Sequence, residues 1–155
     1  MESILFFSPD FPNSQPIPEK FSYYSKNCSP SFQWSNLPEG TQNLALIADD
    51  PDAPVGIWVH WVIYNIPADL NGLPQGISKN EQVRGIGTQG MNDFHKVGYG
   101  GPYPPPGKAH RYFFNLYALD TNLNLAPNLT KEALLKALSG HILAQGQWMG
   151  TYQRN

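Results

Sequence analysis

The sequence predicts a mostly β protein, an antiparallel β-sandwich with a large central sheet and few short helices. Turn-forming residues are frequent, with 14 Gly and 15 Pro among 155 residues, well above average usage. The apolar runs between them are short and rich in β-branched and aromatic residues, which is typical of strands. Two of these runs are apolar on both faces, which indicates strands buried between two layers.

The two strongest strand candidates are Trp58–Ile66 and Arg111–Leu119. Strict alternation of side chains along a strand predicts which residues share a face. For the first run it predicts one face of Trp58, His60, Val62 and Tyr64 and an opposite face of Val59, Trp61 and Ile63. For the second run it places Tyr112, Phe114 and Leu116 together.

Shorter runs at Ile4–Phe7 and Asn43–Ala48 predict further strands. The tail Ile142–Tyr152 also favours a closing strand, because Gly146 and Gly150 would each weaken a helix by about 1 kcal/mol.

One helix is indicated after Thr130, a candidate N-cap. An apolar stripe follows at Leu134, Leu135 and Leu138. Gly140 stands where a left-handed residue would end the helix.

The composition narrows the classes of protein. A chain of this length is the size of one typical domain, so we expect one domain over residues 1–155. Ten Lys and Arg against 12 Asp and Glu leave no basic surface for nucleic acid. The single Cys28 allows neither an internal disulfide nor a cysteine metal cage. We see no secretory signal and no apolar stretch near the ~20 residues that span a bilayer. These features predict a soluble, cytoplasmic protein without stable membrane insertion.

The first candidate site element is Asp49–Pro54, directly after an apolar run. Pro51 and Pro54 disfavour helix at the residues before them, which makes the segment stiff and extended. Its carboxylates Asp50 and Asp52 either face a ligand or cap local backbone amides in an Asx-type turn.

Two further elements lie on the predicted central strands. His60 is the one strongly polar group of its run, so it needs a partner if buried, and a lone histidine there is commonly a satisfied core residue. In His110-Arg111-Tyr112, a period of two places the imidazole and the phenol on one face, where both can donate to one acceptor. Arg111 then points away, and we expect it to pair with an acidic residue.

The fourth element is the loop Gly98–Gly107, with four glycines and four prolines in ten residues. It is either a rigid connection or a nest of exposed backbone N–H groups for an anion. It is not a nucleotide P-loop, because the lysine-serine/threonine ending and the following helix are missing.

The order and spacing of these elements resemble the signature of the phosphatidylethanolamine-binding protein (PEBP) family. The surrounding sequence, including Asn92-Asp93-Phe94 and the tail Gly150–Arg154, is similar to the bacterial branch of this family, the Raf-kinase-inhibitor-like proteins. The similarity covers nearly the whole chain, from about Phe6 to Arg154. The motifs that carry the resemblance are Asp50-Pro51-Asp52-Ala53-Pro54, Trp58-Val59-His60-Trp61, Gly98–Pro106 and His110-Arg111-Tyr112.

The resemblance implies a small pocket that accepts phosphate, acetate or phospholipid head groups. It also implies a non-proline cis peptide near Gly56-Ile57. In one departure from the bacterial branch, His95 stands where those members more often have glycine. The ligand-binding residues implied by the resemblance are Asp50, Asp52, Trp58, His60, Gly101, Pro102, Pro104, His110 and Tyr112.

We therefore predict a protein that binds a small anionic or phosphorylated ligand and modulates a partner protein. We expect no enzymatic activity, no metal and no other cofactor. Three alternatives stay open: a kinase- or protease-inhibitor-like interaction module, a hydrolase that uses the Asp/His cluster, and a metal site from the same side chains. Against the hydrolase, the chain has no Gly-x-Ser-x-Gly motif. The resemblance also suggests a homodimer, although nothing in the sequence marks an interface.

Overall fold

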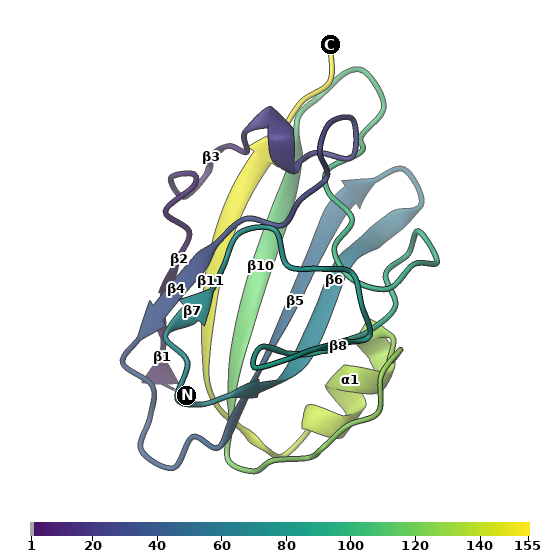
Figure 1. Ribbon diagram of the computed structural model, residues 1–155. Coiled ribbons are helices and arrows are strands. Elements are labelled where there is room, and N and C mark those ends of the chain that lie inside the picture. The colour runs from purple at the N-terminus through teal and green to yellow at the C-terminus, as the bar shows by residue number, and fades with distance from the viewer. Residues whose placement is uncertain (1) are drawn as a thin grey trace.

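The computed structural model describes residues 2–155, which are built around one large sheet (Figure 1). Eight strands of these residues form it in the order β1-β11-β10-β5-β6-β9-β8, with β3 also paired to β11, and β2-β4-β7 form a second sheet. The predicted mostly β sandwich with few helices is confirmed. The elements are β1 (Glu2–Ser3), β2 (Leu5–Phe7), β3 (Gln15–Pro16), the 3₁₀ turn η1 (Glu19–Phe21), β4 (Phe32–Ser35), β5 (Asn43–Ala53), β6 (Gly56–Pro67), β7 (Gly72–Leu73), β8 (Gln82–Val83), β9 (Gly87–Gln89), β10 (His110–Leu119), α1 (Lys131–Leu138) and β11 (Ile142–Tyr152).

The four long strands β11, β10, β5 and β6 are neighbours in the large sheet and pair antiparallel. The pairing departs from a purely antiparallel pattern at the edge, where β1 and β3 each join β11 in parallel. The apolar run predicted to end at Ala48 continues as β5 through the proline-rich segment to Ala53. The stiff, extended conformation predicted for this segment is therefore confirmed.

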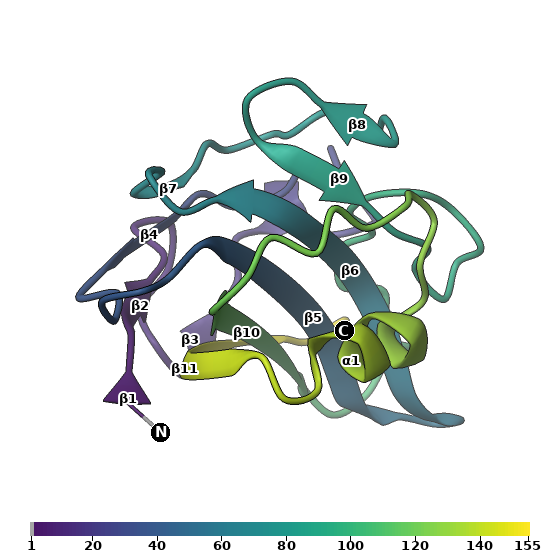
Figure 2. The ribbon, with the colours of Figure 1, turned by 90° about the horizontal axis from the view of Figure 1, so that it is seen from below.

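Both faces of the large sheet are buried, as the apolar character of its central strands predicts. One face packs against the β2-β4-β7 sheet and the N-terminal segment, through side chains such as Phe6, Phe32 and Phe114. The other face packs against α1, whose Leu134 and Leu138 are fully buried. Figure 2 shows α1 on one side of β5 and β6, with β4 and β7 on the other.

The predicted alternation along β6 holds in the middle of the strand and fails at Val59, because two irregularities interrupt the pairing of β6 with β5. Ala48 pairs with Trp61 and the next residue, Asp49, pairs with Val59, so His60 is an extra residue in a β-bulge. A second shift surrounds Asn65, which has a positive φ of 54°. Val59 consequently lies on the α1 side of the sheet with Val62 and Tyr64, whereas Trp61, Ile63 and Ile66 pack on the other side.

The large sheet separates at one end, between β5 and β10. Backbone pairing of these two strands ends at Asp49 and Phe113. Beyond that point β5 stays paired with β6 as far as Ala53, and β10 stays paired with β11 as far as His110. The sheet therefore ends as two separate strand pairs, the β5–β6 hairpin and the pair β10–β11, and Figure 1 shows the upper ends of β10 and β5 apart.

The helix and the closing strand form where the sequence predicts them. Thr130 caps α1, because its Oγ1 accepts a hydrogen bond from the Ala133 amide, and Gly140 follows the helix with φ of 83°. In β11, Gly146 and Gly150 allow the N-terminal segment to pack close to the strand. A Cβ at Gly150 would lie 2.4 Å from Cγ1 of Ile17.

We expect Gly150→Ala to destabilise the protein by about 1–3 kcal/mol, because the added methyl overpacks the contact with Ile17 and Phe11. Urea denaturation followed by tryptophan fluorescence measures the change. Gln147→Ala, at an exposed position of the same strand, is the control and should stay within about 0.5 kcal/mol. Equal effects of the two substitutions would contradict the packing role of Gly150.

Candidate functional site

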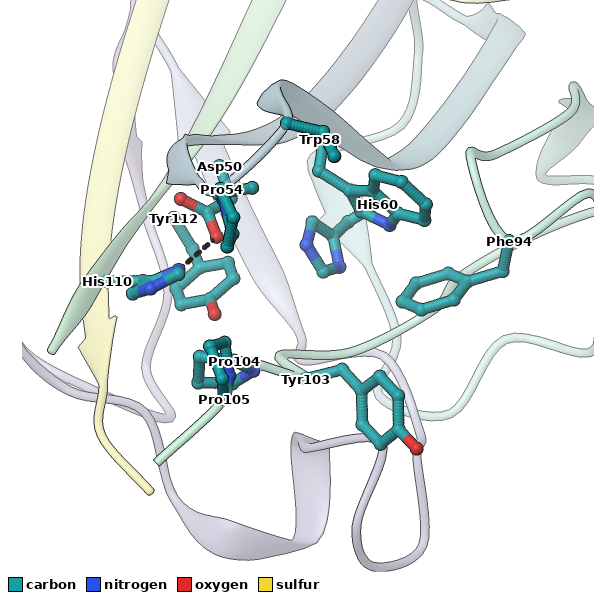
Figure 3. Close-up of a pocket in the computed structure, with 12 residues that line it drawn as sticks. Asp50, Pro54, Trp58, His60, Phe94, Tyr103, Pro104, Pro105, His110 and Tyr112 are labelled. Carbon is teal, nitrogen blue, oxygen red and sulfur yellow. Dashed lines mark hydrogen bonds and ion pairs between the residues drawn. The ribbon is translucent and has the colours of Figure 1, made fainter. Parts of the chain in front are cut away.

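A pocket of about 320 Å³ lies where the sheet separates, between the strand pairs β5–β6 and β10–β11. The loop after Gly98 closes it from the side (Figure 3). Six of the nine sequence-predicted site residues line it: Asp50, Trp58, His60, Pro104, His110 and Tyr112. The other six lining residues are Ala53, Pro54, Val55, Phe94, Tyr103 and Pro105.

Asp50 and His110 join the two strand pairs across the pocket. Nδ1 of His110 lies 2.7 Å from Oδ2 of Asp50, and both residues are buried. Because a carboxylate only accepts, Nδ1 carries the proton and Nε2 is the nitrogen that remains for a ligand. The other oxygen of Asp50 accepts from the Asp52 amide at 2.7 Å. Asp50 thus faces the pocket and also makes the Asx-type contact that the sequence left as an alternative.

Asp52 does not line the pocket, in contrast to its predicted ligand-binding place, because Arg111 occupies its carboxylate. The Arg111 side chain donates to both Asp52 oxygens at 2.9 Å, and the Arg111 backbone amide donates at the same distance. These hydrogen bonds lower the pKa of Asp52 to about 2. The predicted pairing of Arg111 with an acidic residue is confirmed. This ion pair joins the two strand pairs beside the Asp50–His110 contact.

His60 is held by the loop through two hydrogen bonds. Its Nδ1 lies 2.7 Å from the Gly100 carbonyl, and its own carbonyl accepts from the Gly100 amide at 2.8 Å. Burial lowers the pKa of His60 below its ordinary 6.5, although the Gly100 carbonyl and the charge of Asp50 oppose the shift. We therefore take the ring as neutral, with the proton on Nδ1. The partner that a buried His60 requires is this loop.

Tyr112 has a buried hydroxyl with no hydrogen-bond partner, and it is the one such side-chain atom found among residues 2–155. The residue lines the pocket and is only 2% exposed. Burial, and secondarily the negative charge of Asp50, raises the pKa of Tyr112 well above its ordinary 10. Tyr112 therefore stays a neutral phenol with one O–H proton to donate.

The alternative of an anion nest built from loop amides does not hold for Gly98, Gly100 and Gly101. Their N–H groups donate to the Gly90 carbonyl, the His60 carbonyl and Oδ1 of Asn27. These glycines serve close packing instead. A Cβ at Gly101 would lie 2.0 Å from the Phe21 carbonyl oxygen, and one at Gly100 would lie 2.6 Å from the Phe94 ring.

Two predicted ligand-binding residues of the loop, Gly101 and Pro102, therefore lie outside the pocket lining. The Pro102 carbonyl accepts from the Tyr23 amide at 2.9 Å, which ties the loop to the η1 region. The next residues, Tyr103 to Pro105, form the wall instead. The rigid-connection alternative describes the first part of the loop, and the ligand-facing role falls on the second.

Aromatic and proline side chains make most of the pocket wall. Phe94 contacts the rings of both Trp58 and His60, with centroids 5.5 Å apart in each pair. Tyr23 lies behind this wall and stacks on Phe94. The sequence indicates Phe94 only as part of a segment similar to the bacterial branch, because a phenylalanine side chain by itself gives no sign of a site. Its place depends on the Asn92 side chain, which accepts from the Phe94 amide.

Two other features that the resemblance concerns, the peptide bond near Gly56-Ile57 and His95, lie near the pocket. No peptide bond among residues 2–155 is cis, so the expected cis bond near Gly56-Ile57 is absent from the described chain. Gly56 instead closes the β5–β6 hairpin with φ of 105°. His95 has φ of 61° and an exposed side chain. This left-handed backbone conformation is one that glycine adopts without strain.

Among residues 2–155, no group of three or more His, Cys, Asp or Glu side chains is arranged to hold a metal ion. The same residues contain no helix of the length and apolar character needed to cross a membrane.

A β-sandwich with a buried, partly polar pocket at the end of its central sheet is the class of structure that this fold and site define. Residues 7–153 match the family model described as phosphatidylethanolamine-binding protein. The chain belongs to this family, and family membership supports a protein of the binding type. A relative from Methanothermobacter thermautotrophicus, named UPF0098 protein, is 46% identical over 138 residues, which are 89% of this chain and 91% of the relative.

Solved structures agree with this assignment. The chain is similar to a phosphatidylethanolamine-binding protein homologue from Chlamydia trachomatis, with 36% identity, a TM-score of 0.89 and full coverage of both chains. It is also similar to YbcL of E. coli, described as a member of the mammalian PEBP family, with 30% identity, a TM-score of 0.90 and 99% coverage of both chains. These matches confirm the family and are consistent with its bacterial branch.

We expect Arg111→Met to destabilise the protein at pH 7 by at most about 1 kcal/mol, because the pair with Asp52 is largely exposed. Since the pKa of Asp52 is lowered in the folded state, its contribution is present above pH ~4 and disappears as pH falls towards 2. Urea denaturation of wild type and variant between pH 7 and 2 measures this. A stability difference that stays constant to pH 2 would show that packing, and not the ion pair, is lost. Asp52→Asn should show the same pH dependence as Arg111→Met.

Proposed function

We propose that this protein binds a small anionic or phosphorylated ligand, such as phosphate or a phosphorylated head group, in the pocket between the strand pairs β5–β6 and β10–β11. The observation that carries the proposal is the buried hydroxyl of Tyr112, which has no partner in the protein. An unpaired buried polar group costs about 1–3 kcal/mol, so a ligand oxygen that accepts from it recovers that free energy.

The remaining lining supports a ligand with one polar end. The polar side chains Asp50, His110 and Tyr112 gather on one side of the pocket, which we call its base (Figure 3). The walls are apolar or aromatic, with Trp58, Phe94 and Pro104 among them. The volume of about 320 Å³ is at the lower end of the range for small-molecule sites. An oxyanion fits the base, and an attached apolar group fits the walls.

We propose binding and not catalysis, because no hydroxyl of Ser or Thr, thiol or amine lies beside the pocket histidines. Asp50 and His110 have the geometry of an oriented base. The twelve lining residues, however, include no Ser, Thr, Cys or Lys. Cys28 lies elsewhere, where its thiol approaches the Lys20 carbonyl. The Asp50–His110 pair then serves to hold His110 in place.

One observation favours a second candidate, an interaction module whose partner covers the pocket mouth. Val55, Ile57 and Tyr103 are exposed by 77%, 58% and 50%, and Val55 and Tyr103 line the pocket. Ile57→Ser separates the two candidates, since Ile57 is not a lining residue. It should weaken a partner complex and leave the affinity for phosphate unchanged.

We expect Tyr112→Phe to reduce the affinity for phosphate by about 10- to 100-fold, since it removes a hydrogen bond to a charged ligand. Isothermal titration calorimetry at millimolar phosphate measures the loss. The stability of the free protein should stay the same or increase, because the substitution removes a buried hydroxyl without a partner.

Tyr117→Phe is the matched control. Tyr117 lies on the same strand, but it packs on the α1 side of the sheet. Its substitution should leave phosphate affinity unchanged. Wild-type affinity in Tyr112→Phe would overturn the proposed role of the hydroxyl.

A further inference from the structure

We infer that the pocket selects an oxyacid that still carries an acidic proton, such as the monoanion of a phosphate monoester, over an equally charged oxyanion without one. This inference rests on the proposed function and narrows its ligand class. The basis is the number of hydrogen-bond acceptors at the base of the pocket, which a fully deprotonated ligand cannot satisfy.

The first acceptor is His60. Because its Nδ1 is committed to the Gly100 carbonyl, the polar atom that it can offer to the pocket is Nε2. Burial disfavours the charged ring, so Nε2 holds a lone pair and no proton. Figure 3 shows the His60 ring directed into the pocket, between Tyr112 and Phe94. A ligand atom that meets this nitrogen has to be a donor.

The second acceptor is the carboxylate of Asp50. Each of its oxygens accepts one hydrogen bond, from the Asp52 amide and from His110. A carboxylate has about four acceptor positions, so this group can take further donors. Asp50 lines the pocket and is 3% exposed, so bulk water does little to supply them.

The other charged groups nearby do not offset Asp50. Asp49 pairs with Lys131 at 2.6 Å, and Asp52 pairs with Arg111 at 2.9 Å. Each of these carboxylates has its own cation, and neither cation is among the lining residues. Within the pocket lining, Asp50 is paired with His110, whose Nδ1–H donates to it. The Tyr112 hydroxyl remains as a donor at the base of the pocket, while Asp50 and His60 accept.

A ligand that matches this set accepts through some oxygens and donates through another. A phosphate monoester below its second pKa of about 6 has one negative charge and one P–OH group. A sulfate ester has the same charge and a similar shape, but it has no proton to donate. The phosphate hydroxyl can bond to Asp50 or His60, whereas the sulfate oxygens would face these acceptors unpaired.

The test compares phenyl phosphate with phenyl sulfate by isothermal titration calorimetry of the wild-type protein at pH 5. We expect phenyl phosphate to bind at least about tenfold more tightly, since an unpaired buried acceptor is costly. Between pH 5 and 8 its affinity should fall as the ester loses its second proton. Phenyl sulfate, which does not titrate in this range, reports any change that arises from the protein itself.

Equal affinity of the two esters at pH 5 would overturn this inference and leave the proposed function standing. No binding of either ester, or of inorganic phosphate, would overturn the proposed function itself. Asp50→Asn gives a further check, because its amide can donate to sulfate. The preference for phenyl phosphate should shrink by about tenfold in that variant, and an undiminished preference would rule out Asp50 as the selecting group.

Discussion

The site depends on a single structural constraint, the end of backbone pairing between β5 and β10 at Asp49 and Phe113. Up to that point the sheet satisfies its own polar groups. Beyond it, the two strand pairs extend without backbone hydrogen bonds between them, and a cavity opens that side chains have to bridge. The bridges are Asp50 to His110 and Asp52 to Arg111. The motifs that look like a ligand set in the sequence therefore serve first as the connection between two parts of the sheet.

This double role explains how the predicted site residues divide. Asp52 and Arg111 satisfy each other and lie beside the pocket. Asp50 and His110 also pair, but they are buried and keep binding capacity on the pocket side. Tyr112 has no partner within the protein. Groups left partly or wholly unsatisfied in this way are destabilising unless a ligand completes them, and they typically mark functional sites.

The sequence predicts elements well where the information is local. The long strands, the Thr130 N-cap and the common face of His110 and Tyr112 follow from periodicity and residue type. The face of each β6 residue could not be predicted, because the bulge at His60 depends on pairing with β5. The role of the loop glycines could not be predicted for a similar reason. Their role is close approach to Phe21 and Phe94, which are distant in sequence or carry no polar signal.

The charge balance of the pocket then limits what the base can hold. Two like charges about 4 Å apart repel by about 4 kcal/mol at an effective dielectric constant of 20. An anion beside Asp50 has to overcome a cost of that order, since no Lys or Arg is among the lining residues. A proton on the ligand reduces this cost in two ways, because it lowers the charge of the ligand and turns repulsion by a carboxylate into a hydrogen bond. A base with a carboxylate and a neutral imidazole therefore recognises an anion through its remaining proton as much as through its charge.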